Sequence, residues 1–277
     1  MTLTKAVILG ALQGVAEFLP ISSSGHLVII SYLLGAAGEG DTFFPVVLHL
    51  GSMLAIVIAY YEDVLQLIAA FFVLVRDLFT GQIRRKRRSG SRNYLYMLII
   101  SLLPLLLVLP FRDRIYKVFS SPMMVGGCLL LTGCILWVSR MAEDGTTGMA
   151  DMRPVQALLV GISQTVAVIP GISRSGTTVA VAMLAGLRRE FAVRFSLMMS
   201  LPTILAAFVL EFWSLLRINE LPKNLAPYLA GAIAAAITGF LAIRILRGLV
   251  RSNRLHVFSY YCFVVGAATL IYFRFLF

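Results

Sequence analysis

The chain has 277 residues, of which 59% are hydrophobic and only 13% are charged, and its formal net charge is +11 at pH 7. Its mean hydropathy of +0.90 excludes an ordinary soluble domain and indicates an integral membrane protein. The excess of Lys and Arg could suggest a nucleic-acid-binding protein. However, these residues cluster in short segments between apolar runs rather than on a polar domain face, so we expect no nucleic acid as a partner.

The N-terminal region predicts a helical hairpin that enters the membrane without crossing it. Two apolar segments, about Leu3–Leu19 and His26–Ala37, are short for independent spans and flank a polar turn within the stretch EFLPISSSGH. Backbone that leaves a helix at membrane depth survives only where protein or a water-filled cavity surrounds it. The pattern therefore favours a re-entrant hairpin, with Pro20 ending the first helix and the serines capping the second.

Three apolar segments that are long enough, or nearly so, to cross the membrane follow this hairpin. They are Phe43–Tyr61, Tyr94–Phe111 and Pro122–Ser139. We expect the intervening segment Val64–Phe79 to form an interfacial or partly buried helix rather than a further span. The basic segment Ile83–Arg92 should be cytoplasmic, because loops rich in Lys and Arg stay on that side of the membrane.

The second half of the chain repeats this order. Residues 164–177 align with residues 13–26 at a constant separation of 151, and seven of the fourteen positions are identical, including the glutamine and the S-x-S-G pattern. A polar turn again separates two short apolar segments, about Val155–Ile169 and Thr177–Leu187. The three spans that follow are Val193–Trp213, Leu225–Leu246 and Val257–Phe275.

This order predicts a single membrane domain, residues 1–277, that is built from two inverted repeats. The first repeat covers about residues 1–139 and the second about residues 154–277, with a linker at 140–153. Because three spans separate the hairpins, the second hairpin enters from the opposite face of the membrane. That orientation also places the arginines between positions 244 and 254 in the cytoplasm. We therefore predict an all-α fold with six transmembrane helices and two re-entrant helical hairpins.

The tips of the two hairpins are expected to meet near the middle of the membrane and to form an anion-binding pocket. The second helix of each hairpin presents its N-terminus there, with free backbone N–H groups and the positive end of the helix dipole. Arg174 is the only Arg or Lys at the centre of an apolar stretch. Its guanidinium either pairs with Glu17 or holds phosphate oxygens, and the two roles are compatible; we favour the role in phosphate binding.

Residues that differ between the two copies are candidates for chemistry, whereas shared residues are expected to build the turns. Glu17, Ser23 and His26 have no identical counterpart in the second copy, where Arg174 occupies the position of Ser23. The first turn thus carries a carboxylate, a hydroxyl and an imidazole, and the second carries a cation. Gln13 lies four residues before Glu17 and therefore shares its helix face and its pocket.

Other polar residues have more than one interpretation. Ser22 and Ser24 recur in the second copy, so a cap or turn role is preferred to a direct chemical one. We interpret His49, within the first long span, as a hydrogen-bonded packing residue, with a place near the pocket as the alternative. We assign no role to His256.

The sequence resembles the BacA-type undecaprenyl diphosphate phosphatases. The resemblance rests on QGVAEFLPISSSGH (13–26), which fits the family's (Glu/Gln)-x-x-x-Glu motif followed by P-x-S-S-x-G-H, and on PGISRSGTT (170–178). It covers essentially the whole chain. It implies a hydrolase that removes the terminal phosphate of the C55 isoprenoid diphosphate, regenerates the lipid carrier of cell-wall synthesis, and gives bacitracin resistance when overproduced.

The resemblance also implies roles for individual residues. The catalytic set is Glu17, Ser23, His26 and Arg174, with either Glu17 or His26 as the proton acceptor. The set that would bind the substrate phosphates is Ser22, Ser173, Arg174, Ser175 and Thr178. The family implies a divalent cation, Mg²⁺ or Ca²⁺. Because position 13 is Gln where many members have an acidic residue, we assign no metal ligand to the protein and expect the cation to bind with the substrate diphosphate.

The resemblance further implies a homodimer in the bacterial cytoplasmic (inner) membrane, with the active site open to the outer face. A transporter or flippase for a lipid phosphate or another anion is the alternative, because inverted repeats with broken helices are a common transporter construction. The trio of Glu17, Ser23 and His26 favours an enzyme, since a carrier needs neither a nucleophile nor a base.

Overall fold

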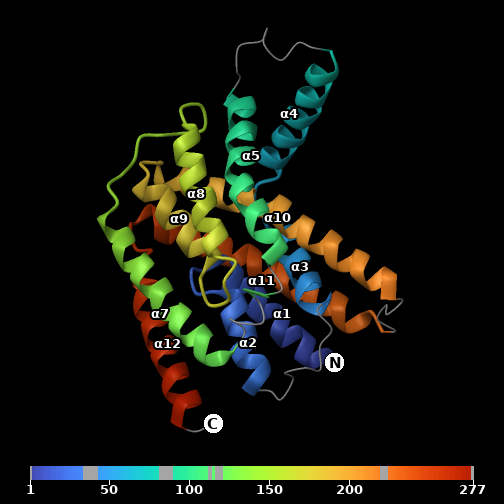
Figure 1. The fold of residues 1–277 in the computed structure, drawn as a ribbon, viewed down its shortest axis with the longest axis vertical. Helices are drawn as coiled ribbons and strands as arrows, with labels where there is room; N and C mark the ends of the chain where they lie inside the picture. Colours follow the sequence, from blue (N-terminus) through green and yellow to red (C-terminus); the bar gives the residue numbers. More distant parts are fainter. Residues whose placement is uncertain are drawn as a thin grey trace.

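The computed structural model of the chain describes residues 2–33, 43–80, 90–111, 114–115, 121–218 and 224–275. Across these ranges the regular structure is helical, and one isolated β-bridge joins Thr147 to Leu187. Figure 1 shows the helices as a bundle in which α7 and α12 run side by side along one flank, and these two helices pack against each other.

The first half of the chain contains the first hairpin and the helices that follow it. These elements are α1 (Leu3–Phe18), α2 (Ser23–Leu33), α3 (Phe43–Ala59), α4 (Tyr61–Phe79), α5 (Gly90–Val108), the short 3-10 helix η1 (Leu109–Phe111) and α7 (Pro122–Val138). The helix α1 begins at an N-cap, Thr2, whose side chain accepts a hydrogen bond from the backbone of Lys5. The predicted hairpin is therefore present, although part of its second predicted segment, 34–37, lies outside the described residues.

The second half contains the second hairpin and three long helices. Its elements are η2 (Ser139–Met141), α8 (Pro154–Val166), α9 (Arg174–Leu184), α10 (Arg189–Ile218), α11 (Ala226–Arg251) and α12 (Val257–Phe275). Each predicted span lies within or close to one of these helices. The helix α10 extends beyond its predicted apolar core at both ends because polar residues there continue the helix outside the hydrophobic window.

Five helices of the described chain are long and apolar enough to cross a membrane: α5, α7 together with η2, α10, α11 and α12. Helix α3 reaches that length only together with α4, and the two are bent by 95° at their junction. The first turn of α4 contains two acidic residues, Glu62 and Asp63, directly after the bend. The all-α integral membrane fold is confirmed. The predicted span Phe43–Tyr61 corresponds to α3, and α4 is a separate helix over the segment that was predicted to be interfacial or partly buried.

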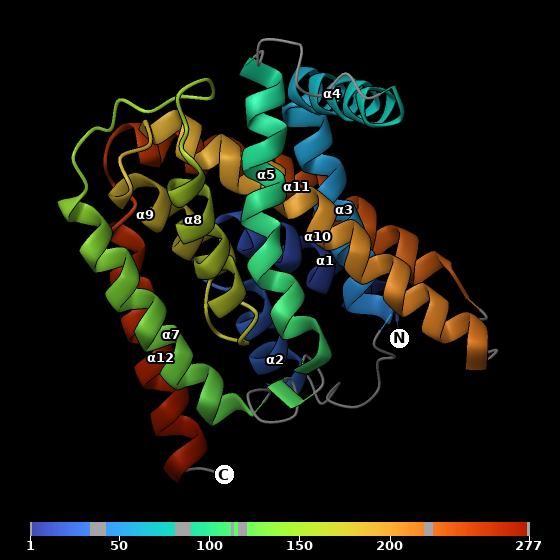
Figure 2. The same ribbon diagram turned by 45° about the horizontal axis from the view of Figure 1, so that its top comes forward.

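The packing of the two hairpins is equivalent. Helix α1 packs against α11, and α8 packs against α5. Gly10 of α1 and Gly161 of α8 are 151 residues apart. A Cβ at Gly10 would collide with the backbone carbonyl of Gly231 in α11, and a Cβ at Gly161 would collide with that of Ser101 in α5. In Figure 2 α9 lies in the upper part of the view and α2 in the lower part, with α1 and α8 between them. The two hairpins thus pack in equivalent ways, whereas their inverted orientation in the membrane stays a prediction.

The hydrophobic core spans both halves of the chain. One cluster of buried side chains includes Phe18 and Ile56 from the first half and Phe195 and Leu246 from the second. Neither half therefore buries its apolar surface alone. The shared core also fixes the relative position of the two hairpin turns, on which the site described next depends.

Candidate active site

The two hairpin turns touch each other in the interior of the molecule. Ser175 at the start of α9 donates a hydrogen bond to the carbonyl of Leu19 at the end of α1, over 3.3 Å. The second turn is also held from α7, because the hydroxyl of Thr132 donates to the carbonyl of Gly171 and accepts from the N–H of Ser173, both over 3.0 Å. The predicted meeting of the hairpin tips is therefore observed in the described residues.

Each turn is capped by the serine that the sequence pattern predicts. The hydroxyl of Ser173 accepts a hydrogen bond from the N–H of Gly176 (3.1 Å), and that of Ser22 accepts one from the N–H of Gly25 (3.3 Å). Ser22 has a φ of 68°, a left-handed conformation that is uncommon outside glycine and costs about 1–3 kcal/mol. This conformation lets the chain reverse sharply just before Ser23.

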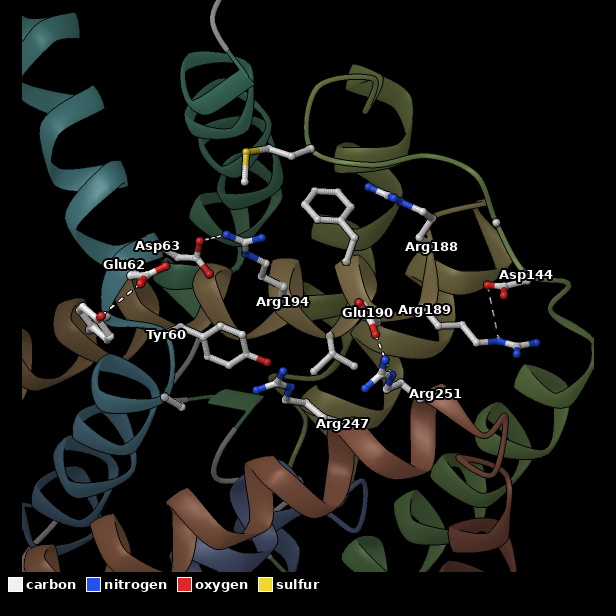
Figure 3. Close-up of a pocket in the computed structure, with 16 residues that line it drawn as sticks. Tyr60, Glu62, Asp63, Asp144, Arg188, Arg189, Glu190, Arg194, Arg247 and Arg251 are labelled. Carbon is white, nitrogen blue, oxygen red and sulfur yellow. Dashed lines mark hydrogen bonds and ion pairs between the residues drawn. The ribbon is translucent and has the colours of Figure 1, made fainter.

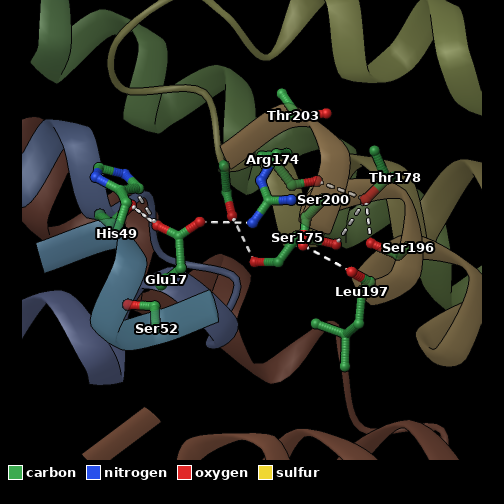
Figure 4. Close-up of polar contacts among 12 residues, drawn as sticks. Glu17, His49, Ser52, Arg174, Ser175, Thr178, Ser196, Leu197, Ser200 and Thr203 are labelled. Atoms are coloured by element: carbon green, nitrogen blue, oxygen red, sulfur yellow. Dashed lines mark hydrogen bonds and ion pairs between the residues drawn. The ribbon is translucent and has the colours of Figure 1, made fainter. Parts of the chain in front are cut away.

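Glu17 is the centre of the polar cluster at this junction (Figure 4), and it is 6% exposed. Its two carboxylate oxygens contact four side chains: Arg174 Nη2 at 2.5 Å, Ser23 Oγ at 2.6 Å, Gln13 Nε2 at 2.8 Å and His49 Nε2 at 3.5 Å. The ion pair with Arg174 joins the first hairpin to the second. The structure therefore brings together the predicted carboxylate, hydroxyl and guanidinium, with the predicted pocket residue Gln13 beside them.

His26 belongs to the same turn but has different partners. Its Nδ1 lies 2.8 Å from the carbonyl oxygen of Ser22, and its Nε2 lies 2.7 Å from the hydroxyl of Tyr261 in α12, whose ring stacks on the imidazole. A carbonyl oxygen only accepts, so Nδ1 carries the proton, and in the neutral ring Nε2 accepts from Tyr261. Both ring nitrogens are thus engaged away from Ser23 and Glu17.

The remaining predicted phosphate-binding residues are buried: Ser22 lies at the start of α2, and Ser173, Ser175 and Thr178 lie around the start of α9. Thr178 donates to the carbonyl of Arg174 over 2.7 Å and lies 2.5 Å from the hydroxyl of Ser196. Ser22, Ser173, Ser175 and Thr178 are each at most 3% exposed, whereas the side chain of Arg174 is 18% exposed. These contacts position Arg174, and direct phosphate binding by the four hydroxyls stays a prediction.

The side chains around Glu17 do not form a metal centre of their own. No group of three or more His, Cys, Asp or Glu side chains with metal-binding geometry occurs within the described residues. Glu17 is the single carboxylate of the cluster, and its oxygens already contact a guanidinium, an amide and a hydroxyl. A hard cation such as Mg²⁺ prefers several oxygen ligands, so this donor set does not fit a protein-built magnesium site.

His49 is the residue whose preferred interpretation from sequence differs most from its position. Its Nδ1 lies 2.6 Å from the carbonyl oxygen of Pro45, which fixes the proton on that nitrogen and turns Nε2 toward Glu17. The side chain is 30% exposed. The alternative interpretation, a place near the pocket, describes it better. The sequence does contain one indication of this position: His49 is an ionisable residue inside an apolar span, and such a residue is costly there unless it has a partner.

Comparisons with known proteins place the whole chain in one group. The family described as "Bacitracin resistance protein BacA" matches residues 6–268. The chain is 37% identical to the undecaprenyl-diphosphatase of Methanosphaera stadtmanae, with 98% of each chain covered. It is 38% identical to the undecaprenyl-diphosphatase of Korarchaeum cryptofilum and 33% identical to that of Alkaliphilus metalliredigens, each alignment covering 98% of this chain and 99% of the relative. The chain therefore belongs to the BacA family.

Proposed function

We propose that this protein hydrolyses undecaprenyl diphosphate to undecaprenyl phosphate and inorganic phosphate. Its relatives across the full chain length are named for this activity. The observation that carries the proposal is the hydroxyl of Ser23, which donates to the carboxylate of Glu17 beside the guanidinium of Arg174. A hydroxyl next to a base and an anion-binding cation is the arrangement that phosphoryl transfer requires.

Substrate binding begins with an exchange of partners at Arg174. In the free protein its guanidinium pairs with Glu17. The planar fork of an arginine suits phosphate oxygens, so the terminal phosphate of the substrate takes the place of the carboxylate as its partner. This exchange releases one oxygen of Glu17 and leaves the other in contact with Ser23. The substrate thereby frees the base that its own cleavage needs.

The chemical step then follows from the contact between Ser23 and Glu17. In one version the serine oxygen attacks the terminal phosphorus while its proton passes to the carboxylate. In the other, a water molecule held by the serine attacks, and the proton that this water loses passes to the carboxylate. The bond from phosphorus to the bridging oxygen breaks, and undecaprenyl phosphate leaves. If the serine attacks directly, water hydrolyses the phosphoserine and releases inorganic phosphate. Of the two predicted proton acceptors, the geometry supports Glu17, because both nitrogens of His26 are occupied.

A divalent cation completes the proposal. Because the side chains around Glu17 offer no metal centre, we place Mg²⁺ or Ca²⁺ on the diphosphate itself, where it neutralises phosphate charge when the substrate binds. Removal of the cation with a chelator should abolish phosphate release, and added Mg²⁺ should restore it. Unchanged activity in excess chelator would contradict this part of the proposal.

The cellular setting is proposed on the family and on the charge pattern. We place the protein in the bacterial cytoplasmic membrane with its active site open to the outer face, because the positive-inside pattern puts the start of the first hairpin outside. The family resemblance supports a homodimer, which native mass spectrometry of the detergent-solubilised protein tests directly. A purely monomeric spectrum would exclude the dimer.

The function is tested by measuring phosphate release from undecaprenyl diphosphate by purified protein in detergent, where the two sides of a membrane do not exist. We expect stoichiometric release of inorganic phosphate in the presence of Mg²⁺. A transporter or flippase needs no chemical step, and the relatives' names do not favour it. Absence of release under these conditions would overturn the proposed function in favour of transport.

A further inference from the structure

A second polar site lies away from the hairpin tips. It is a cavity of about 680 Å³ between the α3–α4 bend, the segment 144–149, the first residues of α10 and the last turns of α11 (Figure 3). None of the residues around Glu17 lines it. By the positive-inside prediction it faces the cytoplasm, because α11 ends there with its arginines. The activity proposed above gives this cavity no role.

Charged side chains dominate the cavity wall, and their pairing is incomplete. Five arginines and four acidic residues line it: Arg188, Arg189, Arg194, Arg247, Arg251, Glu62, Asp63, Asp144 and Glu190. Arg194 pairs with Asp63, Arg251 pairs with Glu190 over 2.7 Å, and Arg189 lies 3.9 Å from Asp144. Within the described chain, Arg188 and Arg247 have no acidic partner.

Two buried nitrogen atoms in this wall also lack a hydrogen-bond partner. They are the Nε atoms of Arg189 and Arg194. Arg247 extends over the ring of Tyr60, 5.5 Å from its centroid, and Figure 3 shows the tyrosine hydroxyl turned toward the guanidinium. Arginines at the end of α11 also offset the helix dipole, but that role does not explain the unsatisfied nitrogens of α10. Buried donors without acceptors indicate a missing acceptor.

The chemistry of the missing group follows from these donors. Guanidinium and hydroxyl donors that converge on one cavity suit a phosphate group. The cavity adjoins α4, whose apolar side chains Leu65 and Phe72 are 60% and 66% exposed, so that acyl chains have a surface beside it. Basic pockets between membrane helices on the cytoplasmic side are suited to anionic lipid headgroups. We propose that this cavity binds a phosphate group, carried either by a membrane lipid or by free phosphate.

The proposal is tested by binding measurements on the full-length protein in neutral detergent. Every sample carries Glu17→Gln together with Arg174→Gln, so that the hairpin site does not contribute and no buried charge is left without its partner. The two probes are inorganic phosphate and short-chain phosphatidic acid, measured by isothermal titration. Arg247→Gln should weaken binding about tenfold, since it removes a charged hydrogen bond. Arg244→Gln is the matched control, because Arg244 is on the same helix, lies over Phe240 and does not line the cavity.

The outcomes separate the two sources of the phosphate. If Arg247→Gln weakens the binding of phosphatidic acid but not of inorganic phosphate, relative to Arg244→Gln, the ligand is a lipid headgroup. If it weakens the binding of inorganic phosphate, the site accepts the free ion. Arg188→Gln, which changes an exposed side chain, provides a second variant should Arg247→Gln fail to fold. The proposal is overturned if neither probe binds, or if the cavity variants bind both probes as tightly as Arg244→Gln does. Because catalysis is not measured, these results do not depend on the proposed hydrolysis.

Discussion

Glu17 is the residue at which the two halves of the molecule meet chemically. A buried carboxylate is costly unless donors surround it, and here those donors come from α1 and from both hairpin turns, while His49 of α3 lies 3.5 Å away. Removing one partner of a buried ion pair costs about 3–5 kcal/mol, because the other charge is left unpaired. Substitutions at this position therefore have to preserve shape if their effect on activity is to be separated from an effect on stability.

Ser23 and its neighbour provide a matched pair of serine variants. Ser23→Ala removes the hydroxyl that contacts Glu17 and should lower the rate of phosphate release by about 100-fold or more. Ser24→Ala removes a hydroxyl whose recorded contact is the 3.4 Å approach to Ser22, and it should leave the rate within a few-fold of the unaltered protein. Near-normal release by Ser23→Ala would contradict the role given to this hydroxyl.

His49 is proposed as a positioning residue that acts through Glu17. His49→Ala should lower kcat about tenfold with little change in KM, because the carboxylate loses a neighbour that restricts it while Arg174 still binds the phosphate. His256→Ala is the control, since His256 contacts the carbonyl of Asn253 in a different part of the molecule. Steady-state kinetics of both variants test this role. If His49→Ala and His256→Ala had the same kcat and KM, His49 would not position Glu17.

At the scale of helices, the glycines of the hairpins allow α1 and α8 to approach their neighbours. Gly161→Ala would drive a methyl group into the carbonyl of Ser101. Overpacking of this kind costs about 1–3 kcal/mol, which exceeds the gain of about 1 kcal/mol from better helix propensity. We therefore expect a lower melting temperature for this variant in detergent.

Gly127→Ala is the control for this effect. Gly127 also lies within a helix, α7, but a Cβ there would meet no atom within 4 Å apart from the backbone of its own helix and its two chain neighbours. This variant should melt at the same temperature as the unaltered protein or slightly above it. If Gly161→Ala were equally harmless, the close packing of α8 on α5 would not hold.

The sequence predicts the elements better than the detailed contacts of the site. The internal repeat predicts both hairpins. Glu17, Ser23 and Arg174 stand out because they differ between the two copies, and the two charged residues among them need partners inside an apolar segment. The partner of His26 could not be predicted in this way. Tyr261 lies 235 residues away, on a helix with no sequence relation to the hairpin.

Two further features depend on the folded chain alone. Ser22 has a left-handed backbone, and in the second hairpin turn the residue with this conformation is Gly171, with a φ of 95°. The residue that aligns with Ser22 is Ser173, so alignment of the two copies does not locate the left-handed residue of the second turn. Of the arginines of the second cavity, Arg247 and Arg251 are interpreted from the sequence only as markers of the cytoplasmic side, and the three at positions 188–194 receive no interpretation. Their convergence results from the packing of α10 against α11, which periodicity in a single segment does not reveal.

At the scale of the whole molecule, the predicted topology places the linker inside and the α10–α11 connection outside. In a variant without native cysteines, Thr146→Cys and Asn224→Cys introduce thiols at two exposed positions. A membrane-impermeant maleimide applied to intact cells should label Asn224→Cys, and it should label Thr146→Cys only after permeabilisation. Labelling of both from outside would reject the proposed orientation.

The central claim is that the junction of the two hairpins hydrolyses a prenyl diphosphate through Glu17. The most direct test is the rate of phosphate release from undecaprenyl diphosphate by Glu17→Gln, which keeps the shape of the side chain and removes its basicity. With Mg²⁺ present and the melting temperature checked, we predict a loss of about 100-fold or more, while Ser24→Ala remains active. A Glu17→Gln protein that releases phosphate at the normal rate would contradict the account.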